Sequence, residues 1–446
     1  MKVQYVSSAC VVVEHEGVRV LCDPWLTDGI YYGSWHHYPP LNIGPEAFHD
    51  VDYLYLTHIH PDHCDVASLK TFPKHIPILI HQYEEKFLLR LIKSLGFENV
   101  IEVEHKVPFG LADGFFLEIL AADNCDPAIC GRWFSCHVSA NPTKTLQIDS
   151  LGVFSGGGKV LVNTNDCPFP VAKVVCEYVI EKYQHIDFLL VGYSGAGPYP
   201  QCFKNLSEYE KIAAAEVKKT QFLEQSVSYL ALLKPSYFLP FAGQYTLGGQ
   251  LSHLNPYRGV PELENLEELF PPLLERSSVS SKMILLNSLE SFDIGREKAS
   301  LQFVPPKAAE RSAYIRDVLL TKKYSYEDFE VTENSFPEMH TKMVQAFQHM
   351  RSKLIFYNYT SETHVYFDIG LGSIFSIPFN GDDLSVVETR EIKEPYVLIE
   401  LHPGLLSMIL NRKAHFNNSE IGSHLTFYRS PNIYERGIYN FLSYLN

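Results

Sequence analysis

The sequence predicts an α/β fold over residues 1–300, followed by a smaller α+β domain over residues 301–446. Short apolar runs alternate with amphipathic helical stretches through the first 300 residues, which is typical of helices that cover a sheet. A chain of 446 residues is also too long for one ordinary hydrophobic core, so two domains are expected. Near residue 300, glycine-rich turns give way to charged helical sequence, and we place the boundary there.

Apolar periodicity places the elements of the first domain. Strand-like runs at Val3–Ser8, Cys10–Glu14 and Val18–Cys22 surround a turn at Glu16-Gly17, which predicts a hairpin unit. The loop 27–48 is rich in Gly, Tyr, Trp, His and Pro, and its length suggests that it lines a site. Further strands are expected at Val51–Leu56, Ile78–His81, Phe115–Ala121, Thr145–Asp149, Lys159–Asn163, Phe188–Val191 and Ser236–Pro240, and helices at Ala67–Thr71, Glu84–Leu95, Val171–Tyr183 and Leu206–Leu233.

The C-terminal domain is expected to begin with helices and continue with strands. The periodicity predicts helices at Lys307–Lys322, Tyr326–Lys353, Leu405–Arg412 and Tyr434–Leu445, and strands at His364–Ile369, Ser373–Ile377 and Tyr396–Leu401. Nothing in this half suggests chemistry of its own, so we expect it to cover the first domain or to mediate dimerisation.

The most informative motif is the run Thr57–Asp65, directly after the predicted strand Val51–Leu56. Four side chains within six residues are metal-ligand types: His58, His60, Asp62 and His63. They lie at a strand end, where α/β folds usually place their sites. Residues two apart in an extended segment point the same way, so His58 and His60 are expected to bind one ion together. Asp62 and His63 follow at the turn and are expected to serve a second ion.

This spacing, His-x-His-x-Asp-His, resembles the hallmark of the metallo-β-lactamase superfamily. The resemblance implies an αββα sandwich, in which two sheets pack face to face with helices outside. It also implies three further ligands downstream: a histidine, a bridging aspartate at another strand end, and a last histidine near the end of the domain.

Three residues match those downstream positions. Asp166 directly follows an apolar strand and is the expected bridging carboxylate, while His253 follows a strand and a glycine-rich loop. His137 precedes the strand expected at Thr145 and is the candidate third ligand of the first ion. The alternative for its segment is a separate structural zinc, because thiolates bind zinc well and three lie there: Cys125, Cys130 and Cys136.

The wider pattern resembles the catalytic part of CMP-N-acetylneuraminate hydroxylase and its bacterial relatives. The segments that carry this resemblance are Asp23–Leu26, Asn163–Cys167, Gly192–Pro200 and Pro240–Gly243, together with His253. The resemblance implies a metallo-β-lactamase-type domain that binds iron and hydroxylates a nucleotide-linked sugar with dioxygen. Those hydroxylases carry a Rieske domain, whose cluster needs Cys-x-His and Cys-x-x-His pairs. No cysteine here has a histidine two residues later, so a separate electron-donor protein is expected unless the chemistry needs no electrons.

Two mechanisms stay open at this stage. In an oxygenase, the ligands hold iron and dioxygen binds at an open position. In a hydrolase, zinc or manganese lowers the pKa of a bridging water that attacks a phosphodiester, lactone or amide. In either case Asp166 would hold both ions, and in the hydrolase Asp62 would orient the nucleophile, so both are the expected catalytic carboxylates. A non-catalytic binding protein is disfavoured because the ligand set is complete.

The charge and composition of the chain favour a small molecule as its main partner. The net charge of −15 argues against nucleic acid or an anionic membrane surface, but a metal can reverse the local field for an anionic metabolite. The N-terminus lacks a signal pattern, no apolar stretch is long enough to span a bilayer, and nine irregularly spaced cysteines suggest reduced thiols, so a cytoplasmic protein is expected. The expected substrate contacts are loop residues: Arg132, Tyr193 and Tyr245.

Overall fold

The computed structural model describes residues 1–122, 149–329, 336–372, 374–388 and 391–445. Its first part is built on two mixed sheets. The first has the order β17 (Lys298–Ala299), β16 (Ser291–Asp293), β1 (Lys2–Ser7), β2 (Cys10–His15), β3 (Val18–Cys22), β5 (Tyr53–Tyr55), β6 (Ile78–His81) and β7 (Val100–Val103). The second has the order β15 (Lys282–Met283), β13 (Tyr237–Phe241), β12 (Phe188–Gly192), β11 (Lys159–Asn163), β10 (Ser150–Gly156), β9 (Phe115–Ala121) and β8 (Phe109–Ala112).

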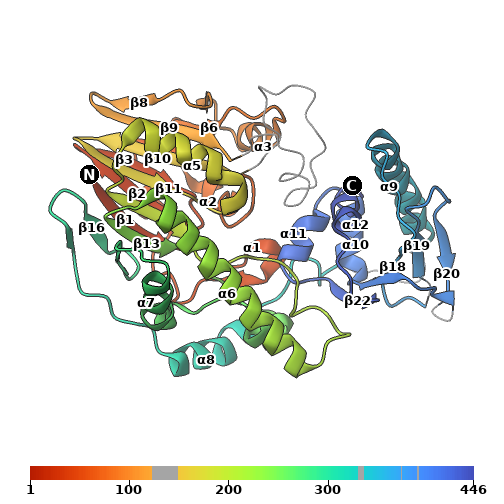
Figure 1. Ribbon diagram of the computed structural model, residues 1–446. Coiled ribbons are helices and arrows are strands. Elements are labelled where there is room, and N and C mark those ends of the chain that lie inside the picture. Colours follow the sequence, from red (N-terminus) through yellow and green to blue (C-terminus); the bar gives the residue numbers. More distant parts are fainter. Residues whose placement is uncertain (123–148, 330–335, 373, 389–390, 446) are drawn as a thin grey trace.

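The two sheets pack face to face, and helices cover their outer faces (Figure 1). One apolar cluster contains side chains of both sheets, such as Val11 and Leu79 of the first and Phe154 and Leu190 of the second. The outer face of the first sheet packs against α2 (Val66–Thr71) and α3 (Phe87–Ser94), and that of the second against α5 (Phe169–Tyr183), α6 (Glu208–Leu233) and α7 (Leu266–Arg276). The predicted αββα sandwich is therefore confirmed.

Parallel pairing brings the strand ends that matter for function to one edge. In the first sheet, β3, β5 and β6 run parallel, and in the second sheet β11, β12 and β13 do so. The histidine-rich run follows β5, and Asp166 follows β11. Polar side chains distant in the chain are thus gathered at the carboxyl ends of parallel strands.

One predicted strand is misplaced. The hairpin partner of β11 is β10, whose register pairs Gly152 with Asn163, whereas Thr145–Asp149 was expected. Residues 145–148 lie outside the described part of the chain, and Asp149 immediately precedes the strand. The run Ser150–Gly156 is largely buried because β9 and β11 flank it on both sides. A strand buried in this way has no alternating polar pattern that would mark it in the sequence.

A separate five-stranded sheet lies within residues 301–446, in the order β20 (Ser385–Val387), β19 (Ile374–Ile377), β18 (His364–Asp368), β21 (Tyr396–Glu400) and β22 (Thr426–Ser430). Its helices are α8 (Ala308–Asp317), α9 (Phe336–Phe356), α10 (Pro403–Leu410), α11 (Phe416–Ile421) and α12 (Arg436–Leu442). The long helix begins at Phe336 rather than at Tyr326, because Tyr324 and Tyr326 pack into the core as an irregular turn. Among the described helices, none is long and apolar enough to cross a membrane.

The C-terminal sheet and the first part of the chain share one apolar cluster. It joins Trp25, and Tyr31 and Trp35 of the loop 27–48, to core residues of the C-terminal part such as Leu405 and Phe427. Within that loop lie α1 (Ile30–Gly33), β4 (Trp35–His36) and the 3₁₀ turn η1 (Pro45–Phe48), and β4 pairs with β14 (Thr246–Leu247). The loop between residues 27 and 48 is therefore a packing element between the two parts.

His424 ties the two parts together and should make the fold sensitive to acid. Its Nε2 lies 2.6 Å from the Tyr31 carbonyl oxygen and its Nδ1 lies 2.8 Å from the Tyr326 hydroxyl. A carbonyl only accepts, so Nε2 carries the proton and Nδ1 accepts from the phenol. Burial lowers the pKa of His424 from 6.5 to about 4, which keeps the ring neutral.

We expect stability to fall as the pH drops from 6.5 towards 4, because only the unfolded chain then takes up this proton. The slope from one such group is at most about 1.4 kcal/mol per pH unit. Urea unfolding of metal-depleted protein should show a shallower loss between pH 6.5 and 5 for His424→Gln than for the wild type. Parallel profiles for the two proteins would contradict the assignment.

Candidate metal centre

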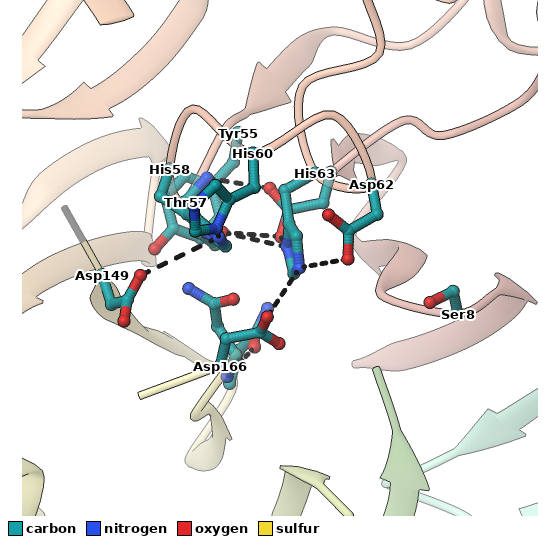
Figure 2. Close-up of polar contacts among 12 residues, drawn as sticks. Ser8, Tyr55, Thr57, His58, His60, Asp62, His63, Asp149 and Asp166 are labelled. Atoms are coloured by element: carbon teal, nitrogen blue, oxygen red, sulfur yellow. Dashed lines mark hydrogen bonds and ion pairs between the residues drawn. The ribbon is translucent and has the colours of Figure 1, made fainter. Parts of the chain in front are cut away.

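The histidine-rich run forms a loop between β5 and α2. Asp65 caps α2 by accepting a hydrogen bond from the Ala67 N–H at 3.0 Å, which ends the loop. The Thr57 carbonyl at its start accepts hydrogen bonds from the Tyr83 hydroxyl at 2.7 Å and the Ser150 hydroxyl at 3.0 Å. Both ends are thus anchored, and the loop places His58 and His63 beside Asp149 and Asp166 of the second sheet (Figure 2).

Three side chains converge with their ligand atoms within 4.8 Å of one another: His58, His63 and Asp166. The His63 Nε2 lies 3.3 Å from an Asp166 oxygen and 3.4 Å from an Asp62 oxygen (Figure 2). The His58 Nε2 lies 2.9 Å from the His60 Nδ1. The structure thus brings together all five predicted ligands of this loop and of the β11 end. Both expected pairs, His58 with His60 and Asp62 with His63, are in contact, and His58 also lies close to His63 and Asp166.

Asp23 orients His63 and was missed by sequence reasoning as a site residue. Its carboxylate lies 2.8 Å from the His63 Nδ1 and accepts from the Thr57 N–H at 2.8 Å and the Thr57 hydroxyl at 2.7 Å. Asp23 is fully buried at the end of β3. By accepting from Nδ1, it leaves the His63 Nε2 free to bind a metal, as carboxylate partners of metal-binding histidines do. The signal for it was an acidic residue directly after an apolar strand.

Asp149 is a second residue that the sequence did not reveal. It is 7% exposed, and its Oδ1 lies 3.8 Å from the His58 Nε2 but has no hydrogen-bond partner among the described residues. Burial and the nearby carboxylates Asp166 and Asp62 raise the pKa of Asp149 to about 7, against the opposing effect of His63. A buried oxygen without a partner is costly. A divalent cation beside it would remove that cost and keep the carboxyl ionised.

The electrostatics of the loop also suit metal binding. Burial and the neighbouring histidines lower the pKa of His58 well below its usual range, so it is a neutral imidazole, the form that coordinates metals. Burial alone would lower the pKa of His63, but Asp166, Asp62 and Asp23 outweigh it and raise that pKa well above its usual range. In the metal-free protein, the His63 Nε2 faces Asp166 and Asp62 and carries a proton at the position where a metal cation would bind. The donor set of imidazoles and carboxylates fits zinc, iron or manganese.

Other predicted site residues lie elsewhere. His253 is exposed in the 3₁₀ turn η2 (Gly249–Tyr257), where its Nδ1 lies 2.6 Å from the Gln250 carbonyl oxygen, and the structure does not bring it to the cluster. Tyr193 and Tyr245 are buried, with exposures of 1% and 3%. Tyr245 stacks on Trp35 with ring centroids 3.6 Å apart. The remaining predictions fall outside the described residues: His137, Arg132, Cys125, Cys130 and Cys136.

Comparison with known proteins assigns the first part of the chain. Residues 2–112, which include the loop from His58 to His63, match the profile of the Beta-lactamase superfamily domain. The chain contains a metallo-β-lactamase superfamily domain. The recognition made from the His-x-His-x-Asp-His spacing is therefore confirmed.

Distant relatives carry this domain within longer chains. Over 265 residues the chain is 26% identical to a putative Rieske 2Fe-2S iron-sulfur protein of Mycobacterium tuberculosis, covering 57% of this chain and 46% of that protein. It is 23% identical over 255 residues to the cytidine monophosphate-N-acetylneuraminic acid hydroxylase of Danio rerio, covering 54% of this chain and 38% of that protein. The chain thus spans less than half of the length of these relatives.

Solved structures with a similar fold include enzymes of two kinds. An isothiocyanate hydrolase from Delia radicum gut bacteria aligns with 15% identity and a TM-score of 0.45, over 67% of this chain and all of that chain. CmlA, a diiron β-hydroxylase from Streptomyces venezuelae, aligns with 16% identity and a TM-score of 0.40, over 64% of this chain and 53% of that chain.

Proposed function

We propose that the protein is an iron-dependent hydroxylase that binds two metal ions and acts on a small anionic metabolite, such as a nucleotide-linked sugar. The observation that carries the proposal is a group of two histidines and three carboxylates, of which only Asp166 is exposed: His58, His63, Asp62, Asp149 and Asp166. Bound iron would supply the activation of dioxygen. The distant similarity to a putative Rieske protein and to a sugar-nucleotide hydroxylase supports this choice over zinc.

The proportion of oxygen ligands also favours iron or manganese. Carboxylates are harder ligands than imidazole, and a site rich in them favours iron or manganese more than a site built of histidines. Asp166 lies between the two halves of the cluster and is the natural bridging residue. Asp149, adjacent to His58, would complete the ligands on that side. Two divalent ions would offset the negative charge of Asp23, Asp62, Asp149 and Asp166, so the loaded site would no longer repel an anionic substrate.

The second candidate is a zinc- or manganese-dependent hydrolase. One Asp62 oxygen accepts from the Tyr31 hydroxyl at 2.5 Å, while the other faces the His63 Nε2 at 3.4 Å. An aspartate held in this way could orient a metal-bound water for attack on a phosphodiester, lactone or amide. Metal identity and the need for dioxygen separate the two functions.

Protein purified without added metal is expected to contain two iron ions per chain. With a chemical reductant and a candidate sugar nucleotide, it should consume dioxygen and add one oxygen atom to the product, as judged by mass spectrometry with ¹⁸O₂. A reductant is needed because one atom of dioxygen ends in water, and we expect a separate electron-donor protein to supply these electrons in the cell. Zinc content with anaerobic turnover of a hydrolysable substrate would overturn the proposal in favour of the hydrolase.

A further inference from the structure

The segment around α11 of the C-terminal part lies directly against the metal-binding region. Figure 1 shows α11 next to α1, which carries Tyr31 and Tyr32. The His415 N–H donates to the Tyr32 hydroxyl at 2.7 Å, and a Cβ at Gly422 would lie 3.0 Å from the Tyr31 Cβ. The contact is therefore close-packed.

Tyr31 connects this segment to a metal-binding side chain. Its hydroxyl donates to Asp62 at 2.5 Å, and its carbonyl accepts from the His424 Nε2 at 2.6 Å. Its backbone is left-handed, with φ 49° and ψ 57°, a conformation that non-glycine residues adopt only when their surroundings hold it. Tyr31 is also buried, and its two hydrogen bonds link His424 to the Asp62 carboxylate.

His424 is itself held by the C-terminal part, through the 2.8 Å hydrogen bond from the Tyr326 hydroxyl. On the same side of the site, the Asn417 side chain lies beside the His60 ring. Asn417 thus approaches the histidine-rich loop directly at His60, and His424 reaches the loop through Tyr31 and its hydrogen bond to Asp62.

We propose that residues 415–424 are an integral part of the metal centre, with His424 and Tyr31 as positioning residues that aim Asp62 at its metal ion. The inference rests on the metal centre of the proposed function. It assigns a role to the C-terminal domain: the domain organises the site, in addition to covering it.

The test is Co²⁺ binding, followed by visible absorption, in six purified variants of the chain. We expect Tyr31→Phe and His424→Ala each to weaken binding of one of the two Co²⁺ ions by about tenfold or more, the range seen when partners of metal ligands are removed. His424→Gln keeps a donor for the Tyr31 carbonyl and should restore most of the affinity. The double variant should bind no more weakly than Tyr31→Phe alone, because both changes act through one path.

His340→Ala is the matched control, because His340 lies on α9 of the same domain and its ring contacts only Phe336 and Phe375 among the described rings. The inference would be overturned if Tyr31→Phe, His424→Gln and His424→Ala all bound Co²⁺ as tightly as this control and the wild type. If His424→Ala does not fold, Tyr31→Phe still decides, since it removes one hydroxyl only. Unchanged Co²⁺ binding by His58→Ala would instead show that the proposed metal centre itself is wrong.

Discussion

Replacing His63 with alanine is expected to lower the affinity for metal by at least about a hundredfold and to abolish turnover. His63 presents its Nε2 to both Asp166 and Asp62, so its loss removes the ligand shared by the two halves of the cluster. It also leaves Asp23 buried without its imidazole partner. Elemental analysis and calorimetric titration with Fe²⁺ under anaerobic conditions measure the effect.

His75→Ala provides the control for that experiment, since His75 is an exposed residue that follows α2 and faces solvent. It should keep the metal content and activity of the wild type. Full metal content in both His63→Ala and His58→Ala would show that the metal binds elsewhere, and the assignment of the loop would then be wrong.

Asp23→Ala is expected to be the most damaging change outside the ligand set. It leaves the His63 Nδ1 and two Thr57 donors without their acceptor in a fully buried position. Each unsatisfied buried donor costs about 1–3 kcal/mol, so the free energy of unfolding should fall by several kcal/mol. Metal affinity should fall by about 10–100-fold, because the orientation of His63 is no longer fixed.

Asp113→Ala, at an exposed turn between β8 and β9, should change neither quantity. Urea unfolding of the metal-free proteins separates the stability effect from the metal effect. A stable Asp23→Ala protein with wild-type metal affinity would show that His63 is oriented by other groups.

The sequence was sufficient for the fold class and for the loop that carries the metal ligands. The strands expected at Ile78–His81, Phe115–Ala121 and Lys159–Asn163 occur at those residues, because apolar runs with clear boundaries mark buried strands. The metal motif is local, since its spacing alone places several ligands on one loop. The domain boundary at residue 300 stays a prediction.

Residues whose roles depend on register could not be found in this way. Asp23 reaches Thr57 because β3 and β5 run parallel with Cys22 opposite Tyr55, and nothing near Asp23 in the chain reveals that pairing. Asp149 approaches His58 from the other sheet, which requires the sandwich to form first. The contact between Tyr31 and His424 joins residues 393 positions apart.

His253 shows the opposite limitation. Its position after a strand and a glycine-rich loop suits a metal ligand, but the loop continues into a 3₁₀ turn that exposes the ring to solvent. The backbone conformation of a few residues decides whether the His253 ring faces the cluster or solvent. A glycine-rich sequence does not determine that conformation, because glycine adopts many backbone angles.

A crystal structure with anomalous X-ray data collected on both sides of the iron edge tests the central claim most directly. The account predicts two iron peaks in this cluster, within bonding distance of His58, His63 and Asp166, with an Asp149 oxygen beside one and Asp62 beside the other. Metal peaks located away from these five side chains, or a well-ordered metal-free cluster in protein that retains its activity, would contradict it.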